Sequence, residues 1–333
     1  MKLFNTKILG TGSFLPDKIL TNDDIAKRVD TNHQWIVERT GIHTRRIADL
    51  SKDESPSGMA KLAALQAIEA ANLTPNDIDF ILVSATLPDM FFPNTACMLQ
   101  HKLGITNACG ALDINAACTG WLYALPMADA MIKTGVYKHI LVVGSEMTSS
   151  FNNWDDRNTC ILFGDGCGAV VLGRASENED SQIYSTTLAA DSTKKDHLML
   201  QAGGACKRVT QEVLDKGENW VTMNGQEVFK SAVKTMASLS EKVIKDSGKT
   251  MEDVDWFIPH QANLRIIEAV GNRFGFPPEK VIINVDKYAN TSSATIPIAL
   301  DEAIREGKIK RGDNLLLAAF GAGLTAGAVF LKY

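Results

Sequence analysis

Short runs of β-branched and other apolar residues alternate along the chain with longer stretches in which apolar residues recur at helical spacing. Residues 1–10 and 78–85 are two of the short runs and are predicted to be strands, whereas the Ala, Leu and Met of residues 56–72 predict a helix. The polar cluster at residues 21–24 predicts a capped helix start within residues 21–39. This alternation favours an α/β architecture.

One block of the pattern occurs twice. Residues 77–84 (DIDFILVS) match residues 253–260 (DVDWFIPH), and both follow a helix of similar length and a polar turn. The next helix–strand pair is repeated as well, since helices that end at Gly135 and Gly307 each lead to a further strand. The offset between the copies stays nearly constant at about 172–176 residues, which indicates an internal duplication.

The duplication predicts two similar α/β halves, residues 1–175 and 176–333, joined near residues 176–181. Residues 176–220 are polar and irregular. We expect them to form a long excursion over the surface, of the kind that is usually functional or mobile.

Cys118 stands at the most informative position in the chain. An apolar strand at residues 111–115 runs into a turn of small residues, and a helix begins at about Thr119. A cysteine at a helix N-terminus meets unpaired N–H groups and the positive end of the helix dipole, which favour a thiolate. The alternative is a buried cysteine that packs as a small apolar side chain, and we assign that role to the other five cysteines.

His260 and Asn290 are two further candidates, both in the second half. His260 ends the repeated strand, and the carboxyl ends of strands are where open α/β sheets bind ligands. Asn290 lies in a strand–turn–helix unit that corresponds to the unit of Cys118, and twofold symmetry would bring these strand ends to one central crevice. The alternatives are a core histidine bonded to a carbonyl group and an ordinary asparagine cap or turn residue.

Two glycine-rich segments do not fit a dinucleotide fingerprint. Residues 320–327 (FGAGLTAG) are followed by a strand-like run instead of a helix, and residues 10–12 lack a third glycine. Residues 320–327 are better explained as a tight turn whose backbone N–H groups face a developing oxyanion.

Composition excludes several classes of protein. The net charge of −5 argues against a general nucleic-acid binder, and no apolar run approaches the ~18–20 residues that span a bilayer. The N-terminal residues lack the apolar stretch of a secretory signal. The six cysteines are too sparse for a disulfide scaffold and contain no CxxC pair, so we expect no zinc site and a cytoplasmic location.

Four short strings occur in the order and spacing of the β-ketoacyl-acyl-carrier-protein synthase III family of the thiolase superfamily, and the chain resembles that family over essentially its whole length. The strings are Ala117-Cys118-Thr119-Gly120, Phe163-Gly164-Asp165-Gly166, Pro259-His260-Gln261-Ala262-Asn263 and Ala289-Asn290-Thr291-Ser292. The resemblance implies a thiolase-like five-layered αβαβα fold made of two similar halves, and a homodimer. It also implies an acyltransferase that condenses a short acyl-CoA, acetyl-CoA above all, with malonyl-acyl-carrier protein to initiate fatty-acid synthesis, without a metal or other cofactor.

The same resemblance assigns roles by position. Cys118, His260 and Asn290 would form the catalytic set, and the backbone N–H groups of Cys118 and Ala322 the oxyanion hole, although the family usually has Gly at position 322. The CoA-binding positions are Thr31, Trp35, Arg39, Arg157 and Asn263. The acyl-pocket positions are Phe163, Met223, Phe229 and, contributed across a dimer, Phe92. The positions for an acidic acyl-carrier protein are Lys230, Arg265 and Arg273, with Asn272 where the family has a basic residue.

Other functions remain open. A relative of this family in secondary metabolism would keep the same Cys-His-Asn set and transfer its acyl group to another acceptor. A papain-like hydrolase has such a set as well, but the duplicated α/β pattern disfavours it, and a non-catalytic acyl-carrier binder would not need all three polar residues. A degradative thiolase needs a second catalytic cysteine near the C-terminus, and no cysteine follows Cys206.

Overall fold

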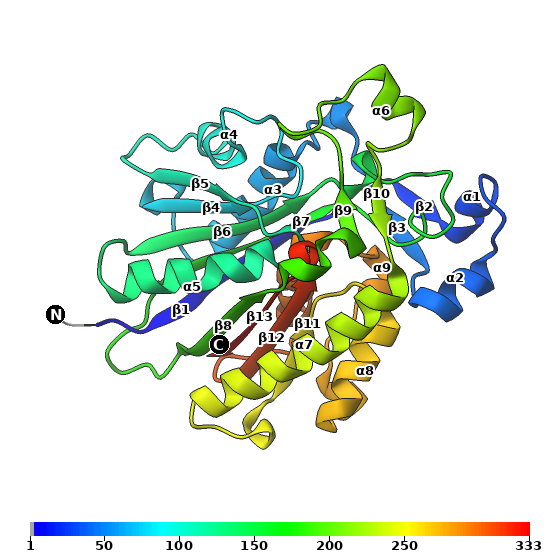
Figure 1. Ribbon diagram of the computed structural model, residues 1–333. Coiled ribbons are helices and arrows are strands. Elements are labelled where there is room, and N and C mark those ends of the chain that lie inside the picture. The colour runs from blue at the N-terminus through cyan, green and yellow to red at the C-terminus, as the bar shows by residue number, and fades with distance from the viewer. Residues whose placement is uncertain (1–2) are drawn as a thin grey trace.

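The computed structural model describes residues 3–333, and most of its strands form two large sheets (Figure 1). Met1 and Lys2, the start of the predicted N-terminal strand, lie outside the described residues. The first sheet consists, in spatial order, of β1 (Thr6–Phe14), β7 (Gly166–Arg174), β6 (His139–Glu146), β4 (Phe80–Ser84) and β5 (Gly110–Ile114). The second consists of β8 (Gln182–Ala190), β13 (Thr325–Lys332), β12 (Asn314–Gly321) and β11 (Trp256–Pro259).

The two sheets have the same pairing pattern. In the first, β4 and β6 are parallel, and β7 and β1 follow as antiparallel neighbours. In the second, β11 and β12 are parallel, and β13 and β8 follow as antiparallel neighbours. An isolated parallel bridge between Phe257 and Val281 occupies the place that β5 has in the first sheet. The strand repeat seen in the sequence therefore corresponds to equivalent strands in space.

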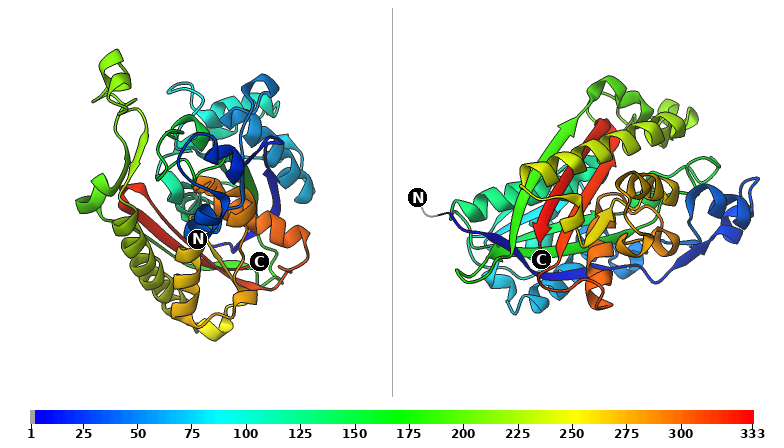
Figure 2. Two further views of the ribbon diagram at one scale, coloured as in Figure 1. Left: turned by 90° about the vertical axis from the view of Figure 1, so that its right-hand side faces the viewer. Right: turned by 90° about the horizontal axis from the view of Figure 1, so that it is seen from below.

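Helices cover both faces of both sheets, which confirms the predicted five-layered αβαβα fold (Figures 1 and 2). Between the sheets lie α5 (Gly120–Lys133) and α10 (Thr295–Arg305). The outer face of the first sheet is covered by α3 (Pro56–Ala70) and α4 (Thr95–Lys102). The outer face of the second is covered by α7 (Gly225–Asp246) and α8 (Leu264–Phe274).

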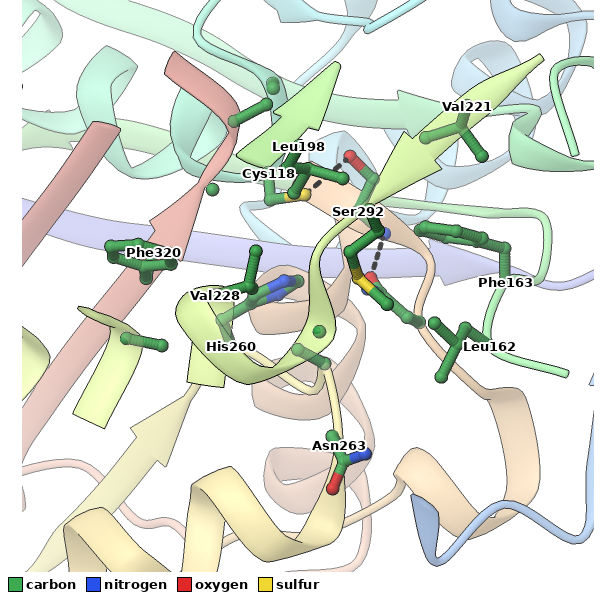
Figure 3. A pocket seen from close by; sticks show the side chains of 18 of the residues that line it. Cys118, Leu162, Phe163, Leu198, Val221, Val228, His260, Asn263, Ser292 and Phe320 are labelled. Carbon is green, nitrogen blue, oxygen red and sulfur yellow. Dashed lines mark hydrogen bonds between the residues drawn. The ribbon is translucent and has the colours of Figure 1, made fainter. Parts of the chain in front are cut away.

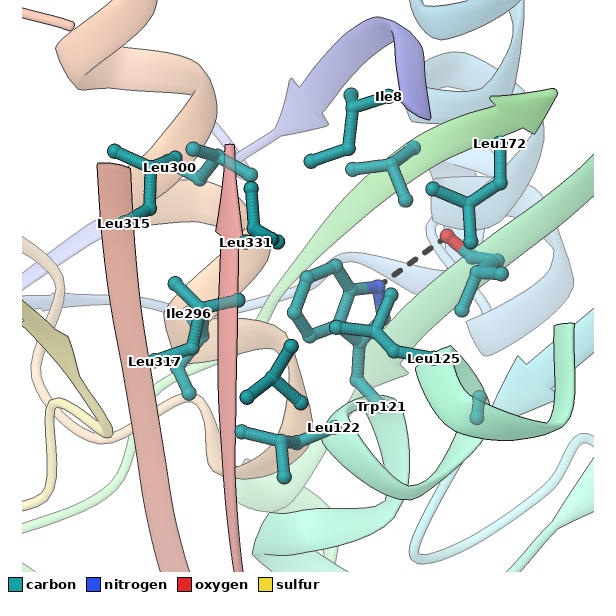
Figure 4. Packing of buried hydrophobic residues seen from close by; sticks show 14 of the residues in the cluster. Ile8, Trp121, Leu122, Leu125, Leu172, Ile296, Leu300, Leu315, Leu317 and Leu331 are labelled. Carbon is teal, nitrogen blue, oxygen red and sulfur yellow. Dashed lines mark hydrogen bonds between the residues drawn. The ribbon is translucent and has the colours of Figure 1, made fainter. Parts of the chain in front are cut away.

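The largest core cluster lies in this central layer and joins the two sheets (Figure 4). Trp121 of α5 is 1% exposed, and its indole N–H donates to the carbonyl of Val142 in the first sheet at 3.3 Å. Leu317 and Leu331 of the second sheet belong to the same cluster. Because this large aromatic side chain is buried with its polar atom hydrogen-bonded, it fixes the position of α5. The turn that precedes α5 is thereby fixed as well.

A small two-stranded sheet and two short helices follow β1 along the chain. Strands β2 (Ile19–Thr21) and β3 (Thr44–Arg46) flank α1 (Asn22–Ala26) and α2 (His33–Thr40). Thr21 and Asp24 form a reciprocal capping box at the start of α1, as the polar cluster predicted. Residues 21–39, predicted to be helical in part, thus contain two short helices.

The expectation for residues 176–220 was wrong for much of the segment. It contains β8, a full strand of the second sheet, and β9 (Leu198–Leu200), which pairs with β10 (Val221–Met223). The polar composition of β8 reflects its place at a sheet edge with one face only partly buried. The remainder, with α6 (Gln211–Asp215), stands out from the body as expected for a surface excursion (Figure 2).

The unit around Asn290 also differs from its prediction, because a short helix, α9 (Val285–Tyr288), replaces the expected strand. Asn290 still forms a single parallel bridge with Phe163, and α10 follows it. Cys118 and Asn290 therefore precede the two equivalent central helices, α5 and α10, although the segments that lead to them have different conformations.

Trp121→Ala is expected to lower the free energy of unfolding by about 3–5 kcal/mol, because it leaves a large void between the two sheets. The midpoint of urea unfolding measures the change. Val136→Ala, at a side chain that is 65% exposed near the end of the same helix, is the control and should stay within about 0.5 kcal/mol of the parent. Equal effects of the two substitutions would contradict a core that depends on Trp121.

Candidate active site

Cys118 lies in a tight turn of residues Ala117–Thr119 between β5 and α5. Ala117 has a φ of +46°, an unusual value for a residue with a side chain. On the opposite side Gly321 approaches so closely that a Cβ atom there would lie 2.9 Å from the Cβ atom of Cys118. Only glycine fits at that position, so the strand end of the second half is packed directly against the cysteine.

The protonation state of Cys118 differs from the expectation for a helix N-terminus. Burial raises the pKa of its thiol to about 11, and this outweighs the hydrogen bonds from the Ser292 hydroxyl and from the backbone N–H groups of Cys118 and Ala322, which lower the pKa. The resting side chain is therefore a neutral thiol.

The turn at Ala322 is free of the strain that an alanine would suffer at positive φ, because the positive φ, +130°, falls on Gly323.

His260 follows β11 and is 3% exposed. Burial lowers the pKa of its imidazole to about 3, so the ring is neutral. Its Nδ1 lies 2.6 Å from the hydroxyl oxygen of Thr295, which also lies 3.1 Å from the carbonyl oxygen of Ser292. When the hydroxyl donates to the nearer atom, Nδ1, the ring proton resides on Nε2.

The carboxamide of Asn290 is oriented by the residue two positions later. Its Oδ1 accepts a hydrogen bond from the backbone N–H of Ser292 at 2.8 Å. Its Nδ2 makes no hydrogen bond to any of the residues that the structure describes. The amide group can therefore donate to a molecule in the cavity.

The three candidate side chains line one cavity of about 190 Å³ (Figure 3). Apart from Cys118, His260 and Asn290, most of its wall is apolar and includes the predicted acyl-pocket residues Phe163, Met223 and Phe229, and Ala322 lines it as well. In Figure 3 the side chains of Cys118 and His260 point into the same space, with Ser292 beside the sulfur. The arrangement places a thiol, a neutral imidazole and an amide around one largely apolar cavity, which suits nucleophilic acyl chemistry.

A wider cleft of about 990 Å³ leads into this cavity, and the walls of both include Leu162, Met223, Gly225, Phe229 and Asn263. Trp35 and Arg39 line the cleft, while Arg157 packs on Trp35 without lining it. The guanidinium carbons of Arg39 and Arg157 lie 4.5 and 4.7 Å from the centre of the Trp35 ring. Thr31 does not line the cleft, although its hydroxyl is buried without a hydrogen-bond partner among the described residues.

The amide of Asn263 connects two helices at the same place. Its Nδ2 donates to the carbonyl oxygen of Arg39 at 3.0 Å, and its Oδ1 accepts from the backbone N–H of Arg265 at the start of α8. Lys230 and Arg265 lie at the edge of the cleft. Lys230 pairs with Glu227 at 3.0 Å, so its charge is partly compensated.

Two predicted site residues lie apart from both spaces. Phe92 is 86% exposed and lines neither the cavity nor the cleft of the single chain. Arg273 lies at the far end of α8, 3.7 Å from Glu241 of α7. Neither therefore joins the site within one chain.

Several residues that hold the site together were not predicted from the sequence: Thr86, Glu146, Gly321, Ser292 and Thr295. Ser292 and Thr295 lie within the motif around Asn290, where hydroxyl side chains are a visible signal. Glu146, at the carboxyl end of a predicted strand, gave a weaker signal because nothing in the sequence shows that it is buried.

Membrane-spanning helices and metal sites are both absent from the part of the chain that the structure describes. None of its helices is long and apolar enough to cross a membrane. Residues 3–333 also contain no group of three or more His, Cys, Asp or Glu side chains that is placed to hold a metal ion.

Comparisons with known proteins agree on one family. Residues 112–192 match the family described as 3-oxoacyl-[acyl-carrier-protein (ACP)] synthase III, and residues 244–333 match its C-terminal family. The chain is 50% identical over 326 residues, 98% of this chain and 97% of the relative, to a beta-ketoacyl-[acyl-carrier-protein] synthase III of Caldanaerobacter subterraneus subsp. tengcongensis. A protein of the same name from Xanthomonas campestris pv. campestris is 48% identical over 335 residues, with 100% of this chain and 99% of the relative covered.

Solved structures give the same result. The crystal structure of 3-oxoacyl-[acyl-carrier-protein] synthase III from Aquifex aeolicus VF5 is similar with a TM-score of 0.90 and 44% identity, and 98% of this chain and 100% of that one are covered. The priming beta-ketosynthase of the R1128 polyketide biosynthetic pathway is similar with a TM-score of 0.91 and 32% identity, with 99% of this chain and 97% of that one covered.

We expect the imidazole of His260 to stay neutral from about pH 8 to about pH 5, because burial holds its pKa near 3. Nitrogen NMR of the histidine side chains measures both the protonation state and the tautomer, and the signals of His260 are identified by their loss in His260→Gln. A titration of His260 with its midpoint between about pH 6 and 7, the ordinary range for histidine, would contradict the apolar environment described above.

Proposed function

The chain belongs to the 3-oxoacyl-[acyl-carrier-protein] synthase III family, and from this premise we propose that Cys118, His260 and Asn290 are its catalytic residues. The enzyme is an acyltransferase that condenses an acyl-CoA with malonyl-acyl-carrier protein and thereby initiates fatty-acid synthesis. The observation that supports the assignment most directly is that the thiol, the neutral imidazole and the free amide group line a single apolar cavity.

In the first step the sulfur of Cys118 attacks the thioester carbonyl carbon of the acyl-CoA, and CoA leaves. Thioester exchange is nearly isoenergetic, so the covalent intermediate divides one difficult reaction into two easier ones. The backbone N–H groups of Cys118 and Ala322 form the oxyanion hole in this proposal. Both already donate toward the sulfur, so an oxygen on the attacked carbon comes within their reach.

In the second step malonyl-acyl-carrier protein loses CO₂, and the resulting enolate attacks the acyl-cysteine. The enolate oxygen needs hydrogen-bond donors, which Nδ2 of Asn290 and Nε2 of His260 supply when the Thr295 hydroxyl donates to Nδ1. Loss of CO₂ itself generates the carbanion, so the proposed reaction uses no metal or nicotinamide. The products are 3-oxoacyl-acyl-carrier protein, CoA and CO₂.

The cleft is the proposed path of CoA. The adenine would stack at Trp35 and Arg157, where ring and guanidinium already pack on each other, with Arg39 and Thr31 close by and Asn263 lining the way inward. The bulky Phe163, Met223 and Phe229 in the cavity wall support a short acyl group such as acetyl. Phe92 takes part only if a second subunit is present.

A homodimer is therefore part of the proposal. Met90, Phe91 and Phe92 form a consecutive exposed apolar segment, with Phe91 80% and Phe92 86% exposed. Segments of this kind are typical of subunit interfaces. The partner's Phe92 would close the acyl pocket.

The acidic acyl-carrier protein would dock at Lys230 and Arg265 on the edge of the cleft, with Arg273 further along α8. The neutral Asn272 leaves this surface with one positive charge fewer than is usual in the family. The proposal also includes a cytoplasmic location, which the six free cysteines support. It further includes the division of the chain into halves 1–175 and 176–333, which the equivalent strand order of the two sheets supports.

A condensing enzyme of secondary metabolism is the less favoured alternative. The relatives at 48–50% identity carry the name beta-ketoacyl-[acyl-carrier-protein] synthase III, whereas the priming beta-ketosynthase of the polyketide pathway is 32% identical. Comparing malonyl-acyl-carrier protein with malonyl-CoA as the acceptor in a condensation assay separates the two functions.

Cys118→Ala is expected to abolish transfer of the acetyl group from acetyl-CoA to the protein, measured as the mass increase of the intact chain. Asn290→Ala should retain this acylation but lose decarboxylation of malonyl-acyl-carrier protein by about 100-fold, because one oxyanion donor is gone. Full condensation activity in Cys118→Ala would end the proposed mechanism.

Arg265→Glu is expected to raise the KM for malonyl-acyl-carrier protein by at least about threefold while the KM for acetyl-CoA changes less, because it places a like charge opposite the acidic carrier. Lys138→Glu is the matched control, since Lys138 precedes β6 at the end of the strand far from the cavity. Equal KM values for the carrier protein in Arg265→Glu and the parent would contradict docking at this surface.

A further inference from the structure

A buried carboxylate that the mechanism above does not use lies close to the nucleophile. Glu146 ends β6 and is 0% exposed, and none of the ion pairs formed by the described residues involves it. Oε1 accepts from the Ser293 hydroxyl at 2.6 Å and from the Thr86 hydroxyl at 3.0 Å, and Oε2 accepts from the backbone N–H of Thr86 at 3.0 Å. An ionisable group buried without a basic partner costs stability, and such groups cluster at functional sites.

A continuous path of hydroxyl groups joins this carboxylate to the sulfur. The Thr86 hydroxyl, bonded to Glu146, lies 3.2 Å from the hydroxyl oxygen of Ser292. The Ser292 hydroxyl lies 3.5 Å from the sulfur of Cys118, within hydrogen-bond distance for sulfur (Figure 3). In the resting site the Ser292 hydroxyl donates to the sulfur, and when it turns to donate to Thr86 it accepts from the thiol instead, so a proton can pass along the path.

The reaction requires such a path because the resting thiol must lose its proton when it attacks. With the pKa of the Cys118 thiol raised to about 11, a base has to take that proton. His260 is poorly suited, because burial lowers its pKa to about 3, whereas burial raises the pKa of Glu146 to about 7. On the neighbouring strand, the Cys167 thiol interacts with the charge of Glu146, and the Asp165 carboxyl that precedes this strand is bound by Ser149 and by the backbone N–H of Ala48.

We propose that Ser292, Thr86 and Glu146 form a proton relay that takes up the proton of Cys118 during acylation and returns it after condensation. This inference rests on the proposed function. Ser292 contacts the reacting sulfur and is a catalytic residue. Thr86 and Glu146 act on the sulfur only through Ser292 and are positioning residues for its proton, and Glu146 does not line the cavity.

Each bond that forms in the proposed steps is matched by one that breaks, and every proton has a donor and an acceptor. During acylation the new C–S bond forms as the thiol proton moves to Ser292, the Ser292 proton to Thr86 and the Thr86 proton to Glu146, while CoA leaves as a thiolate and takes a proton from water. During condensation the enolate carbon displaces the Cys118 thiolate, and the proton of Glu146 returns along the same path to the sulfur. The net reaction consumes one proton from water and releases CO₂.

Single-turnover acylation by acetyl-CoA, followed by quenching and intact mass, tests the relay. In the parent enzyme the rate should fall as the pH drops below about 7, because Glu146 becomes protonated and cannot accept. Glu146→Gln and Thr86→Val should acylate about 100-fold more slowly at about pH 8, and Thr86→Ser should recover most of the loss in Thr86→Val because it restores the hydroxyl.

The sign of the Glu146→Gln effect separates a relay from a structural or electrostatic role. The negative charge of Glu146 raises the pKa of Cys118, so its removal alone would make the thiol more acidic and acylation faster. Alkylation of Cys118 by iodoacetamide, read on its peptide, should accordingly be as fast as in the parent or faster, which shows an intact site. Acylation of Glu146→Gln at the parental rate from about pH 6 to 8 would overturn the relay.

Ser293→Ala is the matched control for Thr86→Val, since both remove a hydroxyl that donates to the same carboxylate but only Thr86 lies on the path. The Ser293 bond lowers the pKa of Glu146, so Ser293→Ala should shift the pH midpoint of acylation upward while the maximal rate stays well above that of Thr86→Val. An unshifted midpoint contradicts Glu146 as the acceptor. A parent enzyme that iodoacetamide alkylates but acetyl-CoA does not acylate contradicts the proposed function, and the relay with it.

Discussion

The structure depends on the burial of one polar segment, residues 290–295, at the contact between the two halves. Asn290 is 7% exposed, and the residues from Thr291 to Thr295 are no more than 2% exposed. Buried polar groups must find hydrogen-bond partners inside the protein, and those of this segment find them in the site. Ser292 bonds the Asn290 carboxamide and contacts the sulfur, Ser293 bonds Glu146, and Thr295 holds His260. The hydrogen bonds that satisfy the buried polar groups of this segment are therefore the same bonds that orient the reacting groups.

The duplicated architecture brings this segment to the nucleophile. Cys118 precedes α5 and Asn290 precedes α10, and these two helices pack side by side between the sheets around Trp121. The end of β12 closes the arrangement, because Gly321 allows its backbone to touch Cys118. Each half supplies groups that the other lacks, so neither half alone contains the site.

Burial also decides the charge state of the site. The same apolar cavity raises the pKa of the Cys118 thiol and lowers that of the His260 imidazole, so both are neutral at rest. A neutral imidazole donates a hydrogen bond to an enolate without protonating it, which suits the condensation step. The neutral thiol, in contrast, needs a proton acceptor, and this requirement connects the cavity to the carboxylate of Glu146.

The fold class, the repeat and the three candidate catalytic residues could be predicted from the sequence, because they depend on local patterns: apolar periodicity, a matching strand in each half, and short motifs around Cys118, His260 and Asn290. The sequence did not reveal β8, whose edge position makes its residues polar, or the short helix before Asn290. Two features follow only from the folded arrangement. One is the neutral state of Cys118, since the helix dipole by itself had predicted a thiolate, and the other is the path from its sulfur to Glu146. The reason is that desolvation and hydrogen bonding act between groups from distant parts of the chain, and only folding sets how deeply and how closely they lie.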